Sequence, residues 1–117
     1  MASHSQLPEI KKDAMYQLLR DGKIEKFNHY KSKGKECDLT SCDFRALDLQ
    51  GLDASGLDMS NSYFRHADLR GIDFSAAKLD GASIHDAKIS GVYFPDKFSS
   101  DEITMSLIRG TRLRAGR

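Results

Sequence analysis

From Cys37 to Asp96 the chain reads, in groups of five, CDLTS CDFRA LDLQG LDASG LDMSN SYFRH ADLRG IDFSA AKLDG ASIHD AKISG VYFPD. The third residue of every group is apolar, and so is the first residue of every group except the one that begins at Ser62. With 39% hydrophobic residues in the chain, twelve apolar residues in one register have a probability of about one in a hundred thousand. The five-residue period therefore decides the fold.

Neither regular element fits a period of five. On an α-helix the apolar residues would spread around the axis, and in a continuous strand every second group would face the wrong way. The first and third residues of a group lie two apart, so three extended residues direct both side chains inward. Glycine, asparagine or aspartate occupies the fifth position in eight groups, which favours a turn there. We therefore predict a chain that winds around an apolar axis, with hydrogen bonds between stacked coils.

The number of groups in each coil follows from comparing this stretch with itself. At a shift of twenty residues 11 of 40 positions are identical, whereas at a shift of fifteen 8 of 45 are identical. This favours four groups per coil and three coils in total. Stacking at twenty predicts four core columns, which are Leu39–Met59–Leu79, Phe44–Phe64–Ile84, Leu49–Leu69–Ile89 and Ala54–Phe74–Phe94.

Three of the groups resemble the consensus of the pentapeptide-repeat family, alanine–Asp/Asn–leucine followed by two variable residues. They are ADLRG (67–71), CDFRA (42–46) and LDLQG (47–51). The resemblance covers about half of the chain and implies a mainly β fold, a right-handed quadrilateral parallel β-helix of about three coils. Large first-position residues depart from the consensus at Leu47, Leu52, Leu57 and Ile72, and the usual Asp/Asn is replaced at Tyr63, Lys78, Ser83, Lys88 and Tyr93. We therefore expect the last coil to differ in width or surface.

Two short helices are expected before the repeats, within an N-terminal helical cap and linker at 1–36. Pro8 suits the first turn of one helix, whose apolar stripe consists of Ile10, Ala14, Met15, Leu18 and Leu19 and ends at Gly22. A second helix, about 24–30, would bury Ile24, Phe27 and Tyr30. These helices either cover the open end of the repeats at 37–96 or bind a partner.

A C-terminal helix and basic tail are expected at 97–117. Ser99 and Glu102 form a capping box, and Gly110 marks the helix end. The apolar residues Ile103, Met105, Leu107 and Ile108 surround more than one face of this helix. One face would cover the stack, and the remainder predicts self-association as a homodimer; a fully intrachain cap is the alternative.

The net charge of +1 hides an uneven distribution. Residues 37–96 carry five Lys/Arg and ten Asp/Glu, whereas 1–36 and 97–117 each carry a net charge of +3. Second-position aspartates form an acidic band, which is either a solvated exterior or an imitation of nucleic-acid phosphate. Stacking at twenty also aligns Arg45, Arg65 and His85, with His66 beside them and Asp86 above His66. These four basic residues are the candidate binding surface for an anion or acidic partner, and an ordinary basic surface is the alternative.

The remaining signals argue against chemistry. We recognise no arranged nucleophile and base, no metal-ligand spacing and no phosphate loop, so we expect no catalytic residues, metal or cofactor. Cys37 and Cys42 are predicted to be reduced core thiols rather than a disulfide or zinc site. Because residues 1–12 lack an apolar signal segment and no apolar run could span a membrane, we expect a cytoplasmic protein that does not contact membranes.

The sequence thus predicts a noncatalytic protein-interaction or scaffold module whose partner is an unidentified protein. The alternative is a DNA mimic that inhibits or modulates a DNA-handling enzyme such as gyrase, because some pentapeptide-repeat proteins resemble DNA in shape and charge. Direct nucleic-acid binding is not expected, since no aromatic residues are interleaved with the basic tail, which contains Arg109, Arg112, Arg114 and Arg117.

Overall fold

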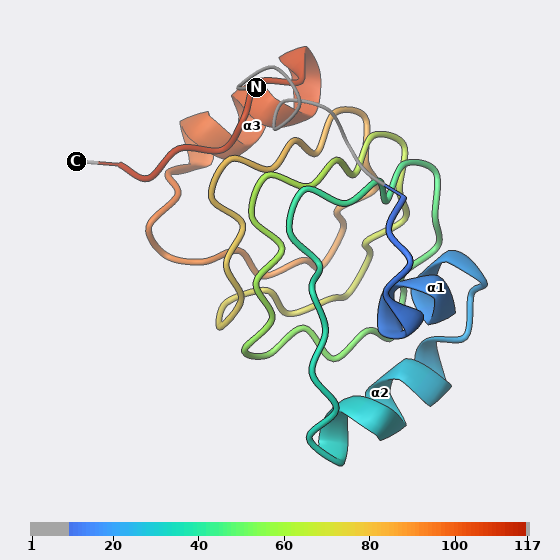
Figure 1. The fold of residues 1–117 in the computed structure, drawn as a ribbon. Helices are drawn as coiled ribbons and strands as arrows, with labels where there is room; N and C mark the ends of the chain where they lie inside the picture. The colour runs from blue at the N-terminus through green and yellow to red at the C-terminus, as the bar shows by residue number, and fades with distance from the viewer. Residues whose placement is uncertain (1–9, 117) are drawn as a thin grey trace, which may run out of the picture.

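The computed structural model describes residues 10–116, so Pro8 and Arg117 lie outside the described residues. Within this range the chain forms three helices: α1 (Ala14–Arg20), α2 (Ile24–Ser32) and α3 (Ser100–Arg109). Between α2 and α3 the chain forms the first coil (37–56), the second coil (57–76) and the third coil (77–96). Figure 1 shows α1 and α2 beside the first coil and α3 at the opposite end of the stack.

The coils are held in register by backbone pairing. Six isolated β-bridges join them, all parallel, and each connects residues twenty positions apart. The bridge between Asp43 and Tyr63 is typical: the N–H of Phe44 donates to the Tyr63 carbonyl at 2.8 Å, and the N–H of Tyr63 donates to the Cys42 carbonyl at 3.0 Å. Twenty residues is the spacing that the sequence comparison favoured.

The described residues form isolated bridges but no β-strand. Ten of the twelve second-position residues take part in these bridges, one on each such side of a coil, before the backbone turns. Ten of the twelve fifth-position residues have positive φ, including the non-glycine residues Ala46, His66 and Asp86, so the fifth residue is where the corner forms. Assignment to the right-handed quadrilateral parallel β-helix class stays a prediction, since the twenty-residue register is present without strands.

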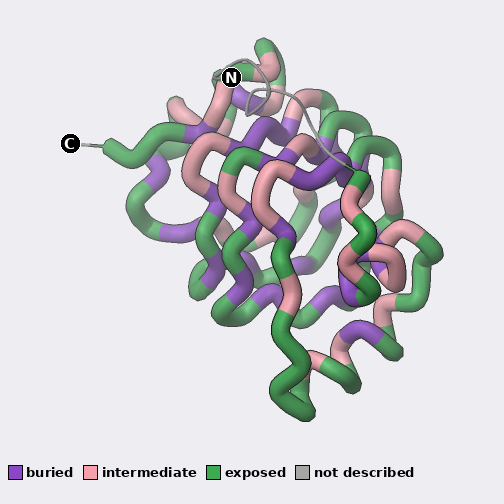
Figure 2. The backbone as a smooth tube through the Cα atoms, in the orientation of Figure 1, coloured by how far each residue is buried: buried purple, intermediate pink, exposed green. Residues whose placement is uncertain are grey.

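Third-position side chains fill the interior of the stack. Ten of the twelve are buried, while Ile89 and Phe94 in the third coil are partly exposed. The Phe44 and Phe64 rings stack with centroids 5.0 Å apart and planes 9° apart. Figure 2 shows buried and exposed positions alternating along each coil. The predicted core columns are therefore confirmed, with weaker coverage at the end of the third coil.

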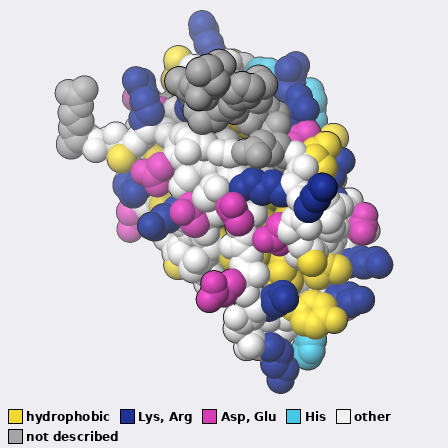
Figure 3. Space-filling model, viewed as in Figure 1, with side chains coloured by type: hydrophobic (Ala, Val, Ile, Leu, Met, Phe, Trp, Pro, Cys, Tyr) yellow, Lys and Arg dark blue, Asp and Glu magenta, His cyan; other side chains and the backbone are white. Residues whose placement is uncertain are grey.

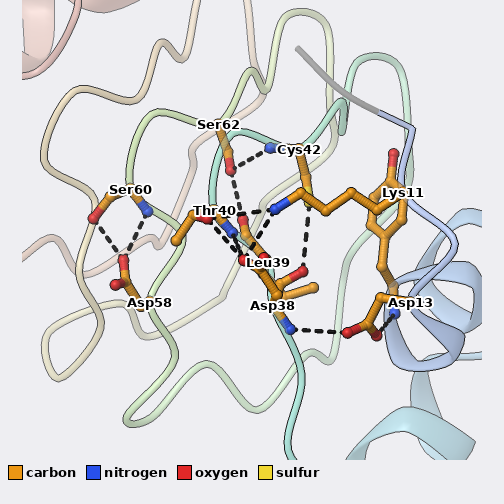
Figure 4. A network of polar contacts seen from close by, with 10 residues as sticks. Lys11, Asp13, Asp38, Leu39, Thr40, Cys42, Asp58, Ser60 and Ser62 are labelled. Carbon is orange, nitrogen blue, oxygen red and sulfur yellow. Dashed lines mark hydrogen bonds and ion pairs between the residues drawn. The ribbon is translucent and has the colours of Figure 1, made fainter. Parts of the chain in front are cut away.

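Ser62, the polar exception among first-position residues, has a structural role. Its hydroxyl donates to the Leu39 carbonyl at 2.7 Å and accepts the Cys42 N–H at 3.1 Å, inside the core (Figure 4). At other corners the first-position N–H donates directly to the carbonyl three residues earlier, as Leu47 does to Phe44. The Ser62 hydroxyl thus replaces the direct backbone hydrogen bond between Cys42 and Leu39, and both backbone groups keep a hydrogen-bond partner.

The first helix begins later than the sequence predicted. Asp13 caps α1: its Oδ1 accepts the N–H groups of Met15 and Tyr16, and its Oδ2 accepts the Asp38 N–H at 2.9 Å (Figure 4). Ile10 therefore precedes the helix and is 61% exposed, so its predicted place in the buried stripe is wrong. One carboxylate both starts the helix and ties it to the first coil.

The second helix supplies further partners to the first coil. The Asn28 side chain accepts the Asp53 N–H and donates to the Gly51 carbonyl, both at 2.9 Å. Phe27 is fully buried, as predicted, whereas Tyr30 is largely exposed and α2 continues past it. Because these contacts satisfy outward-facing backbone groups, α1 and α2 cover the open end of the stack.

At the other end, α3 has the predicted boundaries. The Ser99 hydroxyl accepts the Glu102 N–H at 3.1 Å, and Gly110 ends the helix with φ of 75°. Two backbone N–H groups of the third coil donate to α3: that of Asp86 to the Leu107 carbonyl, and that of Ile84 to the Ser106 hydroxyl. The cap thus lies over the 82–86 corner of the coil.

Candidate functional site

A surface hollow collects the basic residues that the sequence aligned. It has a volume of about 350 Å³ and is lined by Arg45, Tyr63, Arg65, Ser83, His85, Arg109 and Gly110. Its lining comes from all three coils and from the end of α3. We call this feature the basic hollow.

The twenty-residue register positions its lining. Arg45, Arg65 and His85 are fourth-position residues of successive coils, and the Ala46 N–H donates to the Arg65 carbonyl at 2.8 Å. Tyr63 and Ser83 are bridged second-position residues of neighbouring coils. The two columns lie side by side, so the repeat itself builds most of the hollow.

Arg45 is engaged by a carboxylate. Its Nε and Nη2 each lie 2.9 Å from an oxygen of Asp43, whose side chain is only 10% exposed. These hydrogen bonds, more than any other cause, lower the pKa of Asp43. Arg45 therefore contributes little free positive charge to the hollow, and its side chain supports Asp43.

Arg65 and Arg109 have no carboxylate partner among residues 10–116. Arg65 donates from Nε to His66 Nε2 at 3.3 Å, and Arg109 is exposed in the last turn of α3. Beside them, the Arg112 guanidinium lies 5.4 Å from the centre of the Tyr63 ring and donates to its hydroxyl. The positive charge of the hollow rests on these arginines.

The stacking placed Asp86 above His66, but in the structure Asp86 contacts His85. His85 Nε2, not His66, lies 3.4 Å from a carboxylate oxygen of Asp86. His85 Nδ1 is buried without a hydrogen-bond partner, against the backbone of Gly110. The two rings are 6.5 Å apart. His85 therefore supports the end of α3, while His66 accepts from Arg65.

The predicted self-association residues of α3 divide into two pairs. Ile103 and Leu107 are partly buried and pack against the core, whereas Met105 and Ile108 are 44% and 62% exposed. Half of the predicted apolar surface is therefore used within the chain.

A second apolar region lies at the other end of the stack, beside α1 and α2. Met15, Leu18 and Tyr30 line a hollow of about 380 Å³ there, together with Ala14, Lys26 and Lys35.

The acidic band is made of turn-forming side chains. Seven second-position aspartates each accept the N–H of the residue two positions later, namely Asp38, Asp43, Asp48, Asp53, Asp58, Asp68 and Asp73. Three of them also form ion pairs with basic side chains: Lys11 lies 3.0 Å from Asp38, Lys31 lies 3.2 Å from Asp53, and Arg70 lies 2.7 Å from Asp68. In Figure 3 acidic and basic side chains are interspersed over the viewed face.

Comparison with known proteins agrees with the repeat. The family model described as "Pentapeptide repeats" matches residues 58–94, in eight copies. Residues 58–94 are therefore a run of pentapeptide repeats. No curated protein and no solved structure matches it at a significant level. A domain of pentapeptide repeats is consistent in general with a protein-interaction module. Part of the lining of the basic hollow lies within the matched residues.

The cysteines, potential metal ligands and helix lengths lie outside this site. Cys37 and Cys42 are free thiols, and burial raises the pKa of Cys37. Within residues 10–116 no group of three potential metal ligands occurs. No helix in that range has the length and apolar character of a membrane span.

Sequence reasoning missed part of the hollow. The stacking that aligned Arg45 with Arg65 also aligns Tyr63 with Ser83, because these two residues occupy equivalent positions in adjacent coils. Arg109 had no comparable signal. Its place depends on how α3 docks, which the sequence of the helix does not specify.

Proposed function

We propose that the chain is a noncatalytic protein-interaction module that binds an acidic segment of a partner protein in the basic hollow. The observation that carries this proposal is the pair of guanidinium groups, Arg65 and Arg109, that line one hollow without a carboxylate partner among the described residues. Charged side chains on a protein surface are usually interspersed with opposite charges. An excess of one sign in a concave site favours a ligand of the other sign.

The packing of the coils supports a role in binding. Their interior is filled by apolar side chains such as Leu49, Phe64 and Leu69, each at most 1% exposed. The exterior carries the polar residues and the hollow. A partner would therefore be recognised by surface charge and shape.

The DNA-mimic alternative needs a dense set of unpaired carboxylates. Here second-position aspartates accept backbone N–H groups, and Asp38, Asp53 and Asp68 also have cationic partners. This pairing weakens the resemblance to a phosphate backbone and favours the acidic-partner proposal. A gyrase supercoiling assay with and without the protein tests the alternative directly, and inhibition at micromolar concentration would support mimicry.

Homodimerisation through α3 is a separate proposal. Met105 and Ile108 are exposed on the helix, while Ile103 and Leu107 pack on the core. We expect light scattering to show a weak, concentration-dependent dimer that Ile108→Glu abolishes. A wild-type protein that stays monomeric at millimolar concentration would contradict this.

Charge reversal tests the acidic-partner proposal. The double variant Arg65→Glu/Arg109→Glu should lose partner proteins that the immobilised wild type retains from cell lysate, and rising salt should release them. Arg45 is left unchanged because its replacement would leave the Asp43 carboxylate without its partner. Each retained protein is then purified and its affinity measured directly by calorimetry.

A matched control separates site from charge. Lys12→Glu/Lys33→Glu makes the same change in net charge at two exposed lysines outside the hollow. We expect this control to bind the purified partner within twofold of wild type, and the hollow variant to bind at least tenfold more weakly. Equal affinity of all three proteins would overturn the proposal.

A further inference from the structure

The lining of the basic hollow contains arginine, histidine, tyrosine, serine and glycine but no carboxylate. Two other surface hollows differ in this respect. One, between the linker and the first two coils, includes Glu36 and Asp58 among its lining residues, and another beside α3 includes Glu102. An anion entering the basic hollow therefore meets no negative charge from its lining.

The two arginines without carboxylate partners leave many donors available. A guanidinium carries five N–H groups. Arg65 uses its Nε–H on His66, so four remain, and Arg109 has no side-chain hydrogen bond within the described part of the chain. The Ser83 hydroxyl donates to the Gly110 carbonyl at 3.1 Å and so offers a ligand only lone pairs. The ligand must accept hydrogen bonds from arginine.

Asp43 shows how many hydrogen-bond donors one carboxylate uses in this protein. Asp43 is satisfied by the Nε and Nη2 of one guanidinium, that of Arg45, together with one backbone N–H. The hollow holds two further guanidinium groups, those of Arg65 and Arg109. Together they have more N–H donors than the two oxygens of one carboxylate can accept. A phosphate monoester has three terminal oxygens and a charge of about −1.5 to −2 at pH 7, and arginine binds such groups in bidentate fashion.

The hollow is built on parts of the fold whose positions are fixed. Arg65 sits on the second coil, where its carbonyl accepts the Ala46 N–H of the first coil at 2.8 Å. Arg109 precedes Gly110, whose left-handed backbone lies against the His85 ring; a Cβ there would lie 3.3 Å from the ring. The backbone positions that carry the two guanidinium groups are thus fixed by the register and by the end of α3.

We propose that the basic hollow binds a phosphate monoester, carried as a phosphorylated side chain on the partner protein. This inference rests on the proposed function, because it specifies the acidic group that the partner presents. The Arg65 and Arg109 guanidiniums would share the phosphate oxygens. Arg45 would remain paired with Asp43 and take no direct part in binding.

Small-molecule titration tests the inference without knowledge of the partner. The probes are N-acetyl-O-phosphoserine amide, N-acetylglutamate amide and inorganic phosphate, added to ¹⁵N-labelled full-length protein at low salt. We expect phosphoserine amide to shift the side-chain Nε–Hε signals of Arg65 and Arg109. Its affinity should be at least tenfold higher than that of the glutamate compound. Inorganic phosphate should bind no more tightly than phosphoserine amide, which distinguishes a carried phosphate from the free ion.

Single variants locate the binding. Arg65→Glu and Arg109→Glu should each weaken phosphoserine amide binding at least tenfold, whereas Lys33→Glu, with the same charge change at an exposed lysine, should leave it within twofold. Circular dichroism melting checks that each variant folds. Should a glutamate variant unfold, Arg65→Gln and Arg109→Gln replace it and are expected to weaken binding in the same direction.

The outcomes separate this inference from the function on which it rests. Equal affinity for glutamate and phosphoserine amides would overturn the phosphate proposal, while charge-sensitive capture of an acidic partner would still stand. Phosphoserine-induced shifts confined to residues outside the hollow would also overturn it. Selective binding lost in both arginine variants would support it, even if a partner purified by other means fails to bind.

Discussion

The first two coils and the third coil share one register but are stabilised at their corners in different ways. In the first two coils seven of eight second-position residues are aspartates that bind the backbone of their own turn. The third coil has Lys78, Ser83, Lys88 and Tyr93 at these positions. Its 82–86 corner instead donates hydrogen bonds to α3 from the Ile84 and Asp86 N–H groups, and the Ala82 carbonyl accepts the N–H of Leu113 in the segment after α3.

This difference shows how a stacked repeat can end. The first two coils set their corners locally, through short-range hydrogen bonds from backbone N–H groups to aspartate. Both outer coils lack a neighbouring coil on one side, where caps of different structure supply partners: α1 and α2 for the first coil, and α3 with the segment after it for the third. The first coil keeps its aspartates beneath its cap, so the loss of aspartate corners is specific to the third coil.

The largest expected effect compares phenylalanines of the two regions. Phe64→Ala should destabilise the protein by about 3–5 kcal/mol, because a fully buried ring is removed from between Phe44 and Phe74. Phe94→Ala in the third coil should cost less than half as much, since Phe94 is partly exposed. Urea unfolding followed by circular dichroism measures both. Equal losses would mean that the third coil is packed as tightly as the second.

Ser62 provides the next largest effect. Ser62→Ala removes the hydroxyl that joins the Leu39 carbonyl to the Cys42 N–H, and should cost about 1–3 kcal/mol because both buried groups lose their partner. The control is Ser90→Ala, at an exposed position of the third coil, where we expect no measurable change. A neutral Ser62→Ala would show that the corner at 39–42 can form the direct backbone bond.

A smaller effect tests the aspartate corners themselves. Asp58 and Lys78 are bridged second-position residues, but Asp58 accepts hydrogen bonds from the Ser60 N–H and hydroxyl. Asp58→Ala should therefore cost about 0.5–1.5 kcal/mol, whereas Lys78→Ala should be close to neutral. Thermal melting of the two variants measures the difference. If Lys78→Ala is the more damaging change, aspartate does not stabilise the corner.

Acid should weaken the first two coils through the same carboxylates. Hydrogen bonds from Thr40, Arg45 and Ser55 lower the pKa of Asp38, Asp43 and Asp53 respectively. Since each folded-state pKa lies below the unfolded value of about 3.9, the stabilisation is present above that pH and is lost as pH falls through the folded pKa. We expect the melting temperature to drop below about pH 4. The double variant Asp43→Asn/Asp53→Asn should show a shallower drop, and an identical pH profile would contradict this.

Much of the architecture was predictable because it follows from a short period. The apolar first and third positions, the turn at the fifth and the shift of twenty are all local statistics, and burial of Leu39, Phe64 and Leu79 agrees with them. The limits of α3 were also local, since Ser99 and Gly110 carry the signals for a helix start and end. Membership of the β-helix class remains a prediction.

Other features depend on contacts between distant segments. The start of α1 at Ala14 is set by Asp13, which also binds Asp38 across the cap, and no apolar periodicity records such a bond. Arg109 reaches the basic hollow through the docking of α3. The second-position aspartates are mostly exposed, but their turn-forming role was not predicted, because the hydrogen bond from the Ser60 N–H to Asp58 requires a turn conformation that composition does not reveal.

The uniform spacing of the bridges restricts how this fold can change in length. Inserting one group of five would rotate every later side chain by one side of the coil, so that Ser62 would leave Cys42 and Arg65 would leave Arg45. Inserting twenty residues would keep these residues in the same columns, one coil further apart, and would lengthen the stack by one coil. Successful insertions and deletions in this molecule should therefore come in multiples of a whole coil, and each added coil offers one more position for a ligand to contact.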